Sequence, residues 1–239
     1  MRYKNIYKGK FIERPNRFIA LVELADTPGI VEKVHVKNTG RCKELLLPGC
    51  EIYLEKSDNP NRKTQYDLVT VRKDTGTLFN IDSQTPNKIT YEWLKTQDFS
   101  HIKPEFTYGN SRLDFYLEKN IAGNGINEKS KKSNLEKYLI EVKGCTLEID
   151  GIGYFPDAPT ERGVKHLREL TKAAADGFKC SVVFVVQMDG VREVRPNEKT
   201  HPEFKTALEE ARAAGVNIIL LLCKVTPYEV SISEVLYQH

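Results

Sequence analysis

Two short runs near the end of the chain are almost entirely apolar, and a segment of helical character separates them. The runs cover residues 182–186 (Val-Val-Phe-Val-Val) and 216–222 (Val-Asn-Ile-Ile-Leu-Leu-Leu). Between them, residues 202–213 begin with proline and are followed by Gly215, a pattern that favours a helix with a defined end. A continuously apolar strand is typically buried on both faces. These segments therefore predict a β-α-β unit in a sheet covered by helices.

The same alternation extends over residues 86–239. A helix at 160–175 is the clearest further element, because Thr160 can cap its N-terminus and Gly177 follows its end. We expect Val164 and Leu167 on its buried stripe, and the opposite face to carry Arg162, Lys165, His166 and Glu169. The remaining expected elements are a helix at 89–97, strands at 112–118, 137–143 and 146–149, and an edge strand at 229–236. The polar stretch Gly123–Ser133 is expected to be a hairpin loop.

Residues 1–85 have a different character and read as all-β. Expected strands lie at 18–24, 31–36, 50–54, 66–71 and 78–81, separated by turns rich in proline, glycine and asparagine. Five short strands in such a length favour a small barrel over a sandwich. The sequence thus predicts two domains, with a boundary at about residue 85.

Composition narrows the class of protein. Charged residues make up 29% of the 239 residues, and no apolar stretch is long enough to cross a bilayer. The first residues lack the apolar core of a secretion signal, and the five cysteines show no paired short spacing, so we expect a cytoplasmic protein without zinc or disulfides. Residues 1–85 contain 15 Lys/Arg and 11 Asp/Glu, an excess that permits a polyanionic partner.

Two strand-like segments carry the most suggestive chemistry. Asp114 lies in Ser-Arg-Leu-Asp-Phe, and Ile-Glu-Val-Lys places Glu141 and Lys143 two residues apart, on one face of a strand. Two acids and an amine on adjacent strands can hold a divalent cation beside a positioned positive charge, as phosphodiester chemistry requires. The alternative is an ordinary half-buried strand pattern, which recurs by chance in many domains.

Further segments complete a pattern that resembles the sugar fermentation stimulation protein family over nearly the whole chain. They are Asn38-Thr39-Gly40, the two segments around Asp114 and Glu141, Gly153-Tyr154-Phe155-Pro156-Asp157-Ala158, Thr160-Glu161-Arg162-Gly163 and Lys165-His166-Leu167-Arg168-Glu169-Leu170. The resemblance implies an α/β (α+β) two-domain fold, in which an OB-like β-barrel precedes a mixed sheet of the PD-(D/E)XK nuclease type flanked by helices. The long, lysine-rich loop between Asp114 and Glu141 departs from the family's pattern.

With a nuclease-type core, Asp114 and Glu141 would hold Mg²⁺ or Mn²⁺, because magnesium suits one or two carboxylates completed by water and phosphate. Lys143 would orient or deprotonate the attacking water and offset phosphate charge. Glu105 is an outer acid that would reach the cation through water. Together, Asp114, Glu141 and Lys143 are the expected catalytic set.

Candidate contacts to a nucleic-acid backbone lie in both parts of the chain. In the barrel they follow strands, where cations and one aromatic ring can meet a polynucleotide. On the 160–175 helix they form a polar face. A structural Asn-Thr-Gly turn and a solvated helix face are the competing interpretations. The candidates are Asn38, Thr39, Arg41, Lys43, Arg62, Lys63, Tyr66, Arg162, Lys165 and His166.

The resemblance implies binding to DNA, duplex or single-stranded, without strong sequence preference, and regulation of sugar (maltose) utilisation genes. The complete acid–acid–lysine set also supports an alternative, an active Mg²⁺- or Mn²⁺-dependent nuclease. A third hypothesis is a sugar-binding regulator that stacks carbohydrate on Trp93, Tyr154 and Phe155, although core packing accounts for these rings more simply. The sequence carries no signature of an oligomeric interface.

Overall fold

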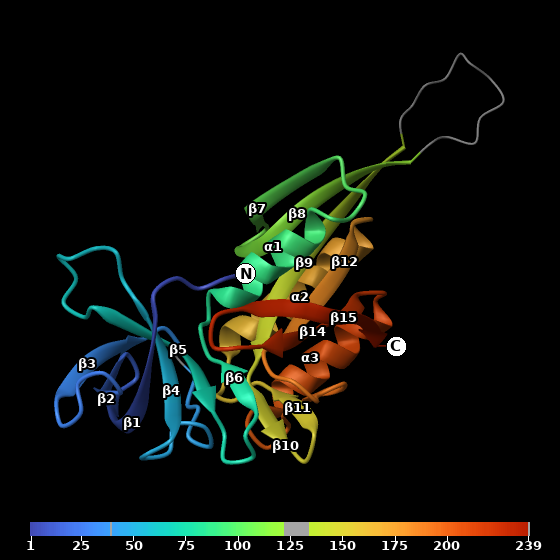
Figure 1. The fold of residues 1–239 in the computed structure, drawn as a ribbon. Helices are drawn as coiled ribbons and strands as arrows, with labels where there is room; N and C mark the ends of the chain where they lie inside the picture. The colour runs from blue at the N-terminus through green and yellow to red at the C-terminus, as the bar shows by residue number, and fades with distance from the viewer. Residues whose placement is uncertain (39, 122–133, 239) are drawn as a thin grey trace.

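The computed structural model describes residues 1–38, 40–121 and 134–238. Figure 1 shows a barrel of N-terminal strands beside a larger sheet with helices on its two faces. The expected loop Gly123–Ser133 and the candidate Thr39 lie outside the described residues. No helix in the described part of the chain combines the length and the apolar character needed to cross a membrane.

Five strands form the barrel, and a parallel pairing closes it. Strands β2 and β4 flank β1, and β3 pairs with β5 through His35 opposite Asp67 and Val36 opposite Leu68. The OB-like fold expected for this part is therefore confirmed. The strands are β1 (Ile6–Asn16), β2 (Ile19–Leu24), β3 (Val31–Val36), β4 (Glu51–Lys56) and β5 (Tyr66–Arg72), and β6 (Leu78–Asn80) extends the sheet from β5.

Strand β1 was not expected from the sequence, although it is the central strand of this sheet. Its inward positions include Gly9 and Phe11, so a glycine stands where an apolar side chain would normally reveal the alternation. A Cβ atom on Gly9 would lie 2.7 Å from the carbonyl oxygen of Glu23 on the paired strand. The close approach of β1 and β2 thus requires glycine at position 9, and this glycine interrupts the alternation of apolar and polar residues that would indicate a strand.

The second sheet is mixed and has the order β15-β14-β12-β9-β8-β7. Its central strands β9, β12 and β14 run parallel, whereas β7, β8 and β15 pair antiparallel with their neighbours. The β-α-β unit predicted from the two apolar runs is present, with α3 between β12 and β14. The strands are β7 (His101–Tyr108), β8 (Ser111–Ile121), β9 (Asn134–Cys145), β12 (Lys179–Val186), β14 (Asn217–Val225) and β15 (Val230–Gln238).

Helices cover both faces of this sheet, and β12 shows why its sequence is apolar throughout. Val182, Phe184 and Val186 pack in one core cluster with α2 and α3, whereas Val183 and Val185 pack in another with α1. The Oγ1 atom of Thr160 accepts a hydrogen bond of 3.0 Å from the N–H of Gly163, as the capping prediction requires. The helices are α1 (Thr85–Leu94), α2 (Glu161–Ala175) and α3 (Pro202–Ala213).

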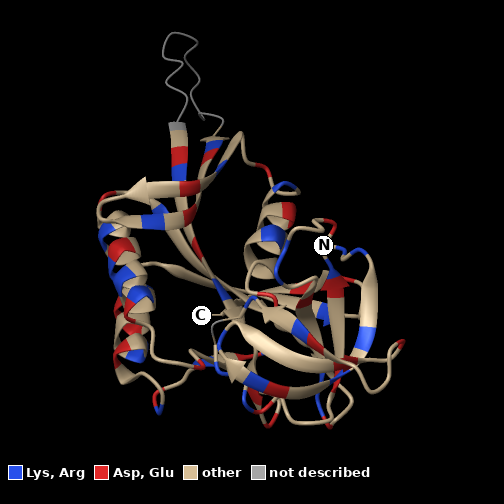
Figure 2. Cartoon of the chain, turned by 90° about the vertical axis from the view of Figure 1, so that its left-hand side faces the viewer, with Lys and Arg blue, Asp and Glu red and all other residues tan. Residues whose placement is uncertain are grey.

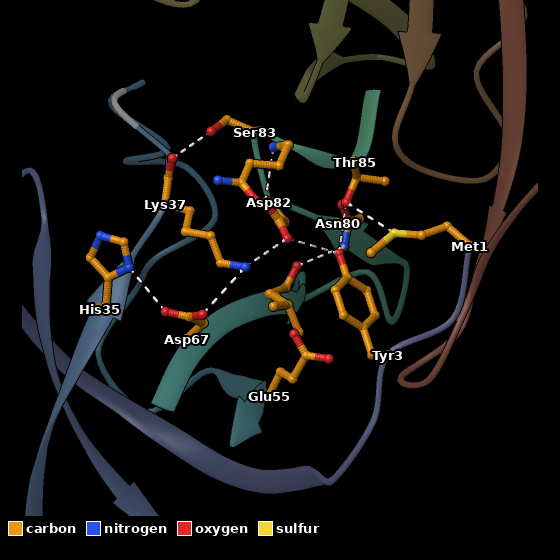
Figure 3. Close-up of polar contacts among 12 residues, drawn as sticks. Met1, Tyr3, His35, Lys37, Glu55, Asp67, Asn80, Asp82, Ser83 and Thr85 are labelled. Carbon is orange, nitrogen blue, oxygen red and sulfur yellow. Dashed lines mark hydrogen bonds and ion pairs between the residues drawn. The ribbon is translucent and has the colours of Figure 1, made fainter. Parts of the chain in front are cut away.

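A buried polar network joins the barrel to the start of the second part (Figure 3). The Nζ atom of Lys37, the residue after β3, lies 3.3 Å from Asp67 Oδ2 and 3.1 Å from Asp82 Oδ2. The side-chain amide of Asn80 donates to the hydroxyl oxygen of Tyr3 at 2.8 Å. These contacts connect β3, β5, the N-terminal segment and the residues before α1.

A small three-stranded sheet completes the fold beneath the helices. Strand β11 pairs antiparallel with β10 and parallel with β13. The end of β6 also meets the end of β12, where the N–H of Asn80 donates to the carbonyl oxygen of Gln187 at 2.9 Å. The barrel is thus tied directly to the central parallel strands. The small sheet consists of β10 (Leu147–Ile149), β11 (Ile152–Phe155) and β13 (Val194–Pro196).

Candidate metal and nucleic-acid site

The three residues expected to form the centre of the site lie on paired strands. Asp114 belongs to β8, and Glu141 and Lys143 belong to β9. The antiparallel ladder between these strands ends at the pair formed by Phe115 and Ile140, so Asp114 and Glu141 are the next residues in register. Residues that lie directly opposite each other on two paired strands project from the same face of the sheet.

Asp114 is held by two donors. Its Oδ2 atom accepts a hydrogen bond of 2.7 Å from the backbone N–H of Val142, and its Oδ1 accepts one of 2.8 Å from the side-chain amide of Asn87 on α1. Burial raises the pKa of the Asp114 carboxyl above its ordinary value, and the negative charge of Glu141 raises it further, although both hydrogen bonds and Lys143 oppose the rise. Two acids brought together in a poorly solvated place favour a bound cation.

Glu141 is almost completely buried, with 3% of its surface exposed. Its Oε1 atom contacts the Nζ of Lys143 and the Nδ1 of His166. Burial alone would raise the pKa of Glu141, but the positive charge of Lys143 and the hydrogen bond from His166 outweigh it and lower the pKa. The Oε2 atom is buried and has no hydrogen-bond partner among the residues that the structure describes. Glu141 is therefore an ionised carboxylate with one oxygen free to accept a ligand.

His166 connects Glu141 to the N-terminal turns of α2. Its Nε2 atom lies 3.4 Å from the Nε of Arg162, which can only donate, so the neutral ring carries its proton on Nδ1 and donates it to Glu141. His166 is 4% exposed and Glu169 is 7% exposed. The expectation that both share the solvent-facing side of α2 with Arg162 and Lys165 is therefore wrong, because the helix rests on the sheet over this site.

Glu105 lies opposite Asp114 across the β7–β8 pairing, at a break in the ladder. The pairs Pro104–Phe115 and Phe106–Leu113 flank it, and its φ angle is 56°. Its carboxylate is exposed and lies 3.6 Å from Arg112 Nη1. Within the described residues, Glu105, Asp114 and Glu141 do not bring three ligand atoms within 4.8 Å of one another.

A different group, Glu161, His201 and Glu203, does bring three such atoms together. The Nδ1 atom of His201 accepts a hydrogen bond of 3.0 Å from the N–H of Thr160. The neutral ring must then carry its proton on Nε2, the nitrogen that faces Glu161. This arrangement anchors the start of α2 and leaves no imidazole lone pair for a metal ion.

Two of the barrel candidates, Arg62 and Asn38, use their side chains in hydrogen bonds within the protein. Arg62 donates to both carboxylate oxygens of Asp67, at 3.0 and 2.6 Å. The Oδ1 atom of Asn38 accepts a hydrogen bond from the N–H of Gly40 at 2.7 Å. An asparagine that accepts from the N–H two residues later is typical of a structural turn.

The other described candidates differ in exposure. The ring of Tyr66 packs edge-on against Tyr7. Arg41 and Lys43 are exposed in the loop after β3, and Lys63 is exposed in the loop before β5. On α2, Arg162 and Lys165 are exposed, and the Nζ of Lys165 donates to the carbonyl oxygen of Asn110 at 2.6 Å.

Sequence reasoning missed two residues that organise the site. Asn87 positions Asp114, and a helix beginning at Thr85 instead of residue 89 brings it there. Arg14 donates to the carbonyl oxygens of Asn38, Gly40 and Arg41, so one guanidinium shapes the whole turn. Pro86 in the first helical turn could have revealed the earlier helix start. Nothing local links Arg14 to this turn, because Asn38, Gly40 and Arg41 lie more than 20 residues away along the chain.

Comparisons with known proteins agree with this architecture. Residues 12–81 match the SfsA N-terminal OB domain, and residues 84–229 match the sugar fermentation stimulation protein RE domain. Sugar fermentation stimulation protein homologues from Desulfitobacterium hafniense (strain Y51) and Ruminiclostridium cellulolyticum are each 51% identical over 229 residues. The first alignment covers 95% of this chain and 92% of the homologue, and the second covers 94% and 93%.

A solved structure is also similar over the whole chain. It is Pyrococcus furiosus SfsA in complex with Ca²⁺, with a TM-score of 0.78 and 28% identity, and the match covers 100% of this chain and 95% of that one. The two domain matches together cover most of the chain, and the bacterial homologues are about half identical to it. The chain belongs to the sugar fermentation stimulation protein family.

Proposed function

We propose that this protein binds DNA without strong sequence preference and holds a divalent cation at Asp114 and Glu141, where the cation meets the phosphate backbone. The observation that carries the proposal is the buried Oε2 atom of Glu141, which has no partner in the described part of the chain although the carboxylate is ionised. A buried carboxylate oxygen left without a donor is costly unless something binds it. A cation shared with Asp114 would remove that cost.

The donor set fits magnesium or manganese. Asp114 and Glu141 offer hard carboxylate oxygens, and Mg²⁺ is commonly bound by one or two carboxylates together with water and substrate phosphate. The Ca²⁺ complex of the Pyrococcus furiosus relative supports a site for a divalent cation in this fold. When bound, such a cation supplies positive charge to a phosphate oxygen. Glu105 would act only through water, because its carboxylate is exposed beside Arg112.

The DNA contacts we propose come from local cations and not from overall charge. Figure 2 shows acidic and basic residues interspersed over both parts of the chain, and the formal net charge is only +3. Arg41, Lys43 and Lys63 are exposed on the barrel, and Arg162 and Lys165 are exposed on α2. Arg62 and His166 would support these surfaces indirectly, through Asp67 and Glu141.

A salt titration tests DNA binding directly. The affinity for labelled duplex and single-stranded oligonucleotides is measured by fluorescence anisotropy between about 50 and 300 mM KCl. The slope of log affinity against log salt concentration then reports the number of phosphates contacted. We expect the affinity to fall steeply with salt and to vary little among unrelated sequences. An affinity that is independent of salt, or no binding at the lowest salt, would reject the proposal.

Hydrolysis of phosphodiesters is a second candidate, and the contact between Lys143 and Glu141 favours it. The Lys143 ammonium lies beside the carboxylate that we assign to the cation, where it can neutralise phosphate charge and orient a water molecule. Plasmid, linear and single-stranded DNA should be incubated with Mg²⁺ or Mn²⁺. We expect cleavage that Asp114→Ala and Lys143→Met abolish, whereas Lys137→Met, an exposed lysine on the same strand, retains it. DNA that stays intact under all conditions would reject hydrolysis and leave DNA binding as the only proposed activity.

We propose that the cellular setting is the regulation of sugar (maltose) utilisation genes in the cytoplasm. The curated relatives carry the name of sugar fermentation stimulation, which supports this setting. All five cysteines are free, as expected where thiols stay reduced. Transcript levels of sugar utilisation genes in a deletion strain, with and without the Asp114→Ala protein, test the assignment. Unchanged transcripts in the deletion strain would contradict it.

A further inference from the structure

A cleft of about 590 Å³ lies between the barrel and the second domain. It begins beside the candidate metal site, because Gly144 follows Lys143 and Pro86 precedes Asn87, and both line it. We call it the interdomain cleft. Its walls include Arg17, Asn38 and Arg41 from the barrel, and Gly144, Phe155 and Asp157 from the second domain.

Hydrogen bonds across the chain hold the barrel wall of this cleft in place. The Nη1 atom of Arg14 donates to the carbonyl oxygens of Gly40 and Arg41 at 2.9 and 3.0 Å, and Nη2 donates to those of Arg17 and Asn38 at 2.7 and 2.6 Å. One guanidinium thus joins two loops of the barrel. The geometry of this wall is set before any ligand arrives.

Direct contacts between the domains fix the opposite wall. The Oδ2 atom of Asp157 accepts from the N–H of Arg41 at 3.0 Å, and a Cβ atom on Gly40 would lie 2.3 Å from that oxygen. A Cβ atom on Gly144 would lie 2.5 Å from Gln187 Oε1. At Gly40 the two domains therefore meet too closely for any larger residue, and at Gly144 the second domain is itself packed too closely for one. A preformed cleft binds without the cost of ordering its walls.

The lining suits a phosphate joined to a planar, polar group. Arg17 and Arg41 are exposed, and neither forms a salt bridge with any residue that the structure describes. Phe155 is half-buried in the wall, where its ring packs against Phe184 and Phe204, and the side-chain amide of Asn38 lines the interior. The amide nitrogen of Gln187, which also lines the cleft, already donates to Asn80 and Asp82. Cations for the backbone, a ring for stacking and an amide for a base edge are the features that bind single-stranded nucleic acid.

We propose that the interdomain cleft receives one or two unpaired nucleotides of the DNA strand whose phosphodiester lies at Asp114, Glu141 and Lys143. The inference rests on the proposed DNA binding. The volume lies within the range of about 300–1,000 Å³ in which proteins enclose small ligands. A base within a duplex is stacked and paired, so only an unpaired nucleotide can place its base in the cleft. The protein then prefers DNA with an unpaired extension over blunt duplex.

Three labelled DNAs test the preference by anisotropy at one low salt concentration: a blunt duplex, the same duplex with a four-nucleotide 3′ extension, and one with a 5′ extension. We expect at least one extension to bind about fivefold or more tighter than the blunt duplex, the size of a single stacking contact. Ala158→Trp fills the cleft with an indole and should remove the preference while retaining blunt-duplex affinity. Ala213→Trp, at the exposed end of α3, is the matched control and should behave as the unmodified protein.

A second variant covers the case in which Ala158→Trp does not fold, as judged by circular dichroism. Arg41→Ala removes a cation at the mouth of the cleft and should reduce the preference for an extension. Salt-dependent binding to blunt duplex with equal affinity for extended DNA would overturn the cleft proposal but leave DNA binding intact. Absence of binding to all three DNAs would overturn both. Calorimetric binding of deoxyadenosine monophosphate that Ala158→Trp abolishes, without any preference for extended DNA, would identify a free-nucleotide site and overturn the strand assignment.

Discussion

The carboxylate of Asp114 accepts a hydrogen bond of 2.7 Å from the backbone N–H of Val142, the residue between Glu141 and Lys143. The backbone ladder of β8 and β9 ends just before this point, at Phe115 and Ile140. The side chain therefore replaces a strand carbonyl as the acceptor, and it fixes the acid of one strand against the acid and amine of the other.

Replacing Asp114 with asparagine should stabilise the protein and weaken cation binding. The pKa of Asp114 is raised in the folded state, so its ionised form costs stability once the pH exceeds the ordinary value of about 4. Asparagine keeps an acceptor for Val142 and removes the charge. We expect Asp114→Asn to raise Tm at pH 7.5 by about 2–4 °C per kcal/mol gained, and to show no gain below about pH 4.

Differential scanning fluorimetry across pH measures the stability of this variant, and Mn²⁺ titration calorimetry measures its affinity for the cation. Asp74→Asn, in an exposed turn, is the control and should change neither quantity. A lower Tm at pH 7.5, or an unchanged Mn²⁺ affinity, would show that Asp114 has a purely structural role.

Removing the His166 ring should reduce both the stability of the protein and its affinity for the cation, because the ring donates a hydrogen bond to Glu141. His166→Ala deletes a donor to a buried carboxylate, which should lower the free energy of unfolding by about 3 kcal/mol. It should also reduce Mn²⁺ affinity by about 10-fold or more, as loss of a residue that orients a ligand does. His166→Asn retains an N–H donor near the Nδ1 position and should recover part of both losses.

Urea denaturation and Mn²⁺ titration compare these variants with His101→Ala, an exposed histidine on β7. A purely structural role predicts that the stability changes while the Mn²⁺ affinity of the folded protein does not. Equal Mn²⁺ affinities for His166→Ala and the unmodified protein would therefore contradict the positioning role.

Asp67 should stabilise the barrel in a pH-dependent way. Burial would raise the pKa of its carboxyl, but hydrogen bonds from Arg62 and His35 and the charge of Lys37 lower it to about 2. A lowered folded-state pKa stabilises the protein above the ordinary value of about 4, and this contribution is lost as the pH falls toward 2. Asp67→Asn should reduce stability at pH 7 by about 1–2 kcal/mol, with a smaller difference at pH 3. Urea midpoints at the two pH values test this, and a difference that grows toward pH 3 would refute it.

Arg62 and Lys63 are neighbours in one barrel loop, but their replacement should affect different quantities, the stability for Arg62 and the salt dependence of DNA binding for Lys63. Lys63 is exposed, so Lys63→Ala should lower the slope of log affinity for DNA against log salt by about 0.9 and leave Tm unchanged. Arg62 is bound to Asp67, so Arg62→Ala should lower Tm and leave the slope nearly unchanged. Anisotropy titrations and thermal melts measure both. The opposite pattern would place Arg62 on the DNA.

The apolar strands and capped helices were predictable because their signals are local. Every position of 182–186 is buried, and alternate residues pack against helices on opposite faces, as a continuous apolar run requires. The helix at Pro202–Ala213 was predicted with its observed bounds. Strand β7 was not predicted although Ile102, Phe106 and Tyr108 alternate with exposed polar residues, because Pro104 interrupts the run and a proline argues against any strand but an edge strand.

The acids and the lysine could be chosen from sequence because strand period and the family's segments single out Asp114, Glu141 and Lys143. Their partners could not. The contacts of Asn87 with Asp114, of His166 with Glu141 and of Arg14 with the turn at Asn38 join residues 24 to 27 positions apart. By itself the sequence determined which segments are buried and which residue types could hold a cation. Only the tertiary structure decided which polar groups satisfy one another, because hydrogen bonding between distant segments depends on how the sheet, barrel and helices pack.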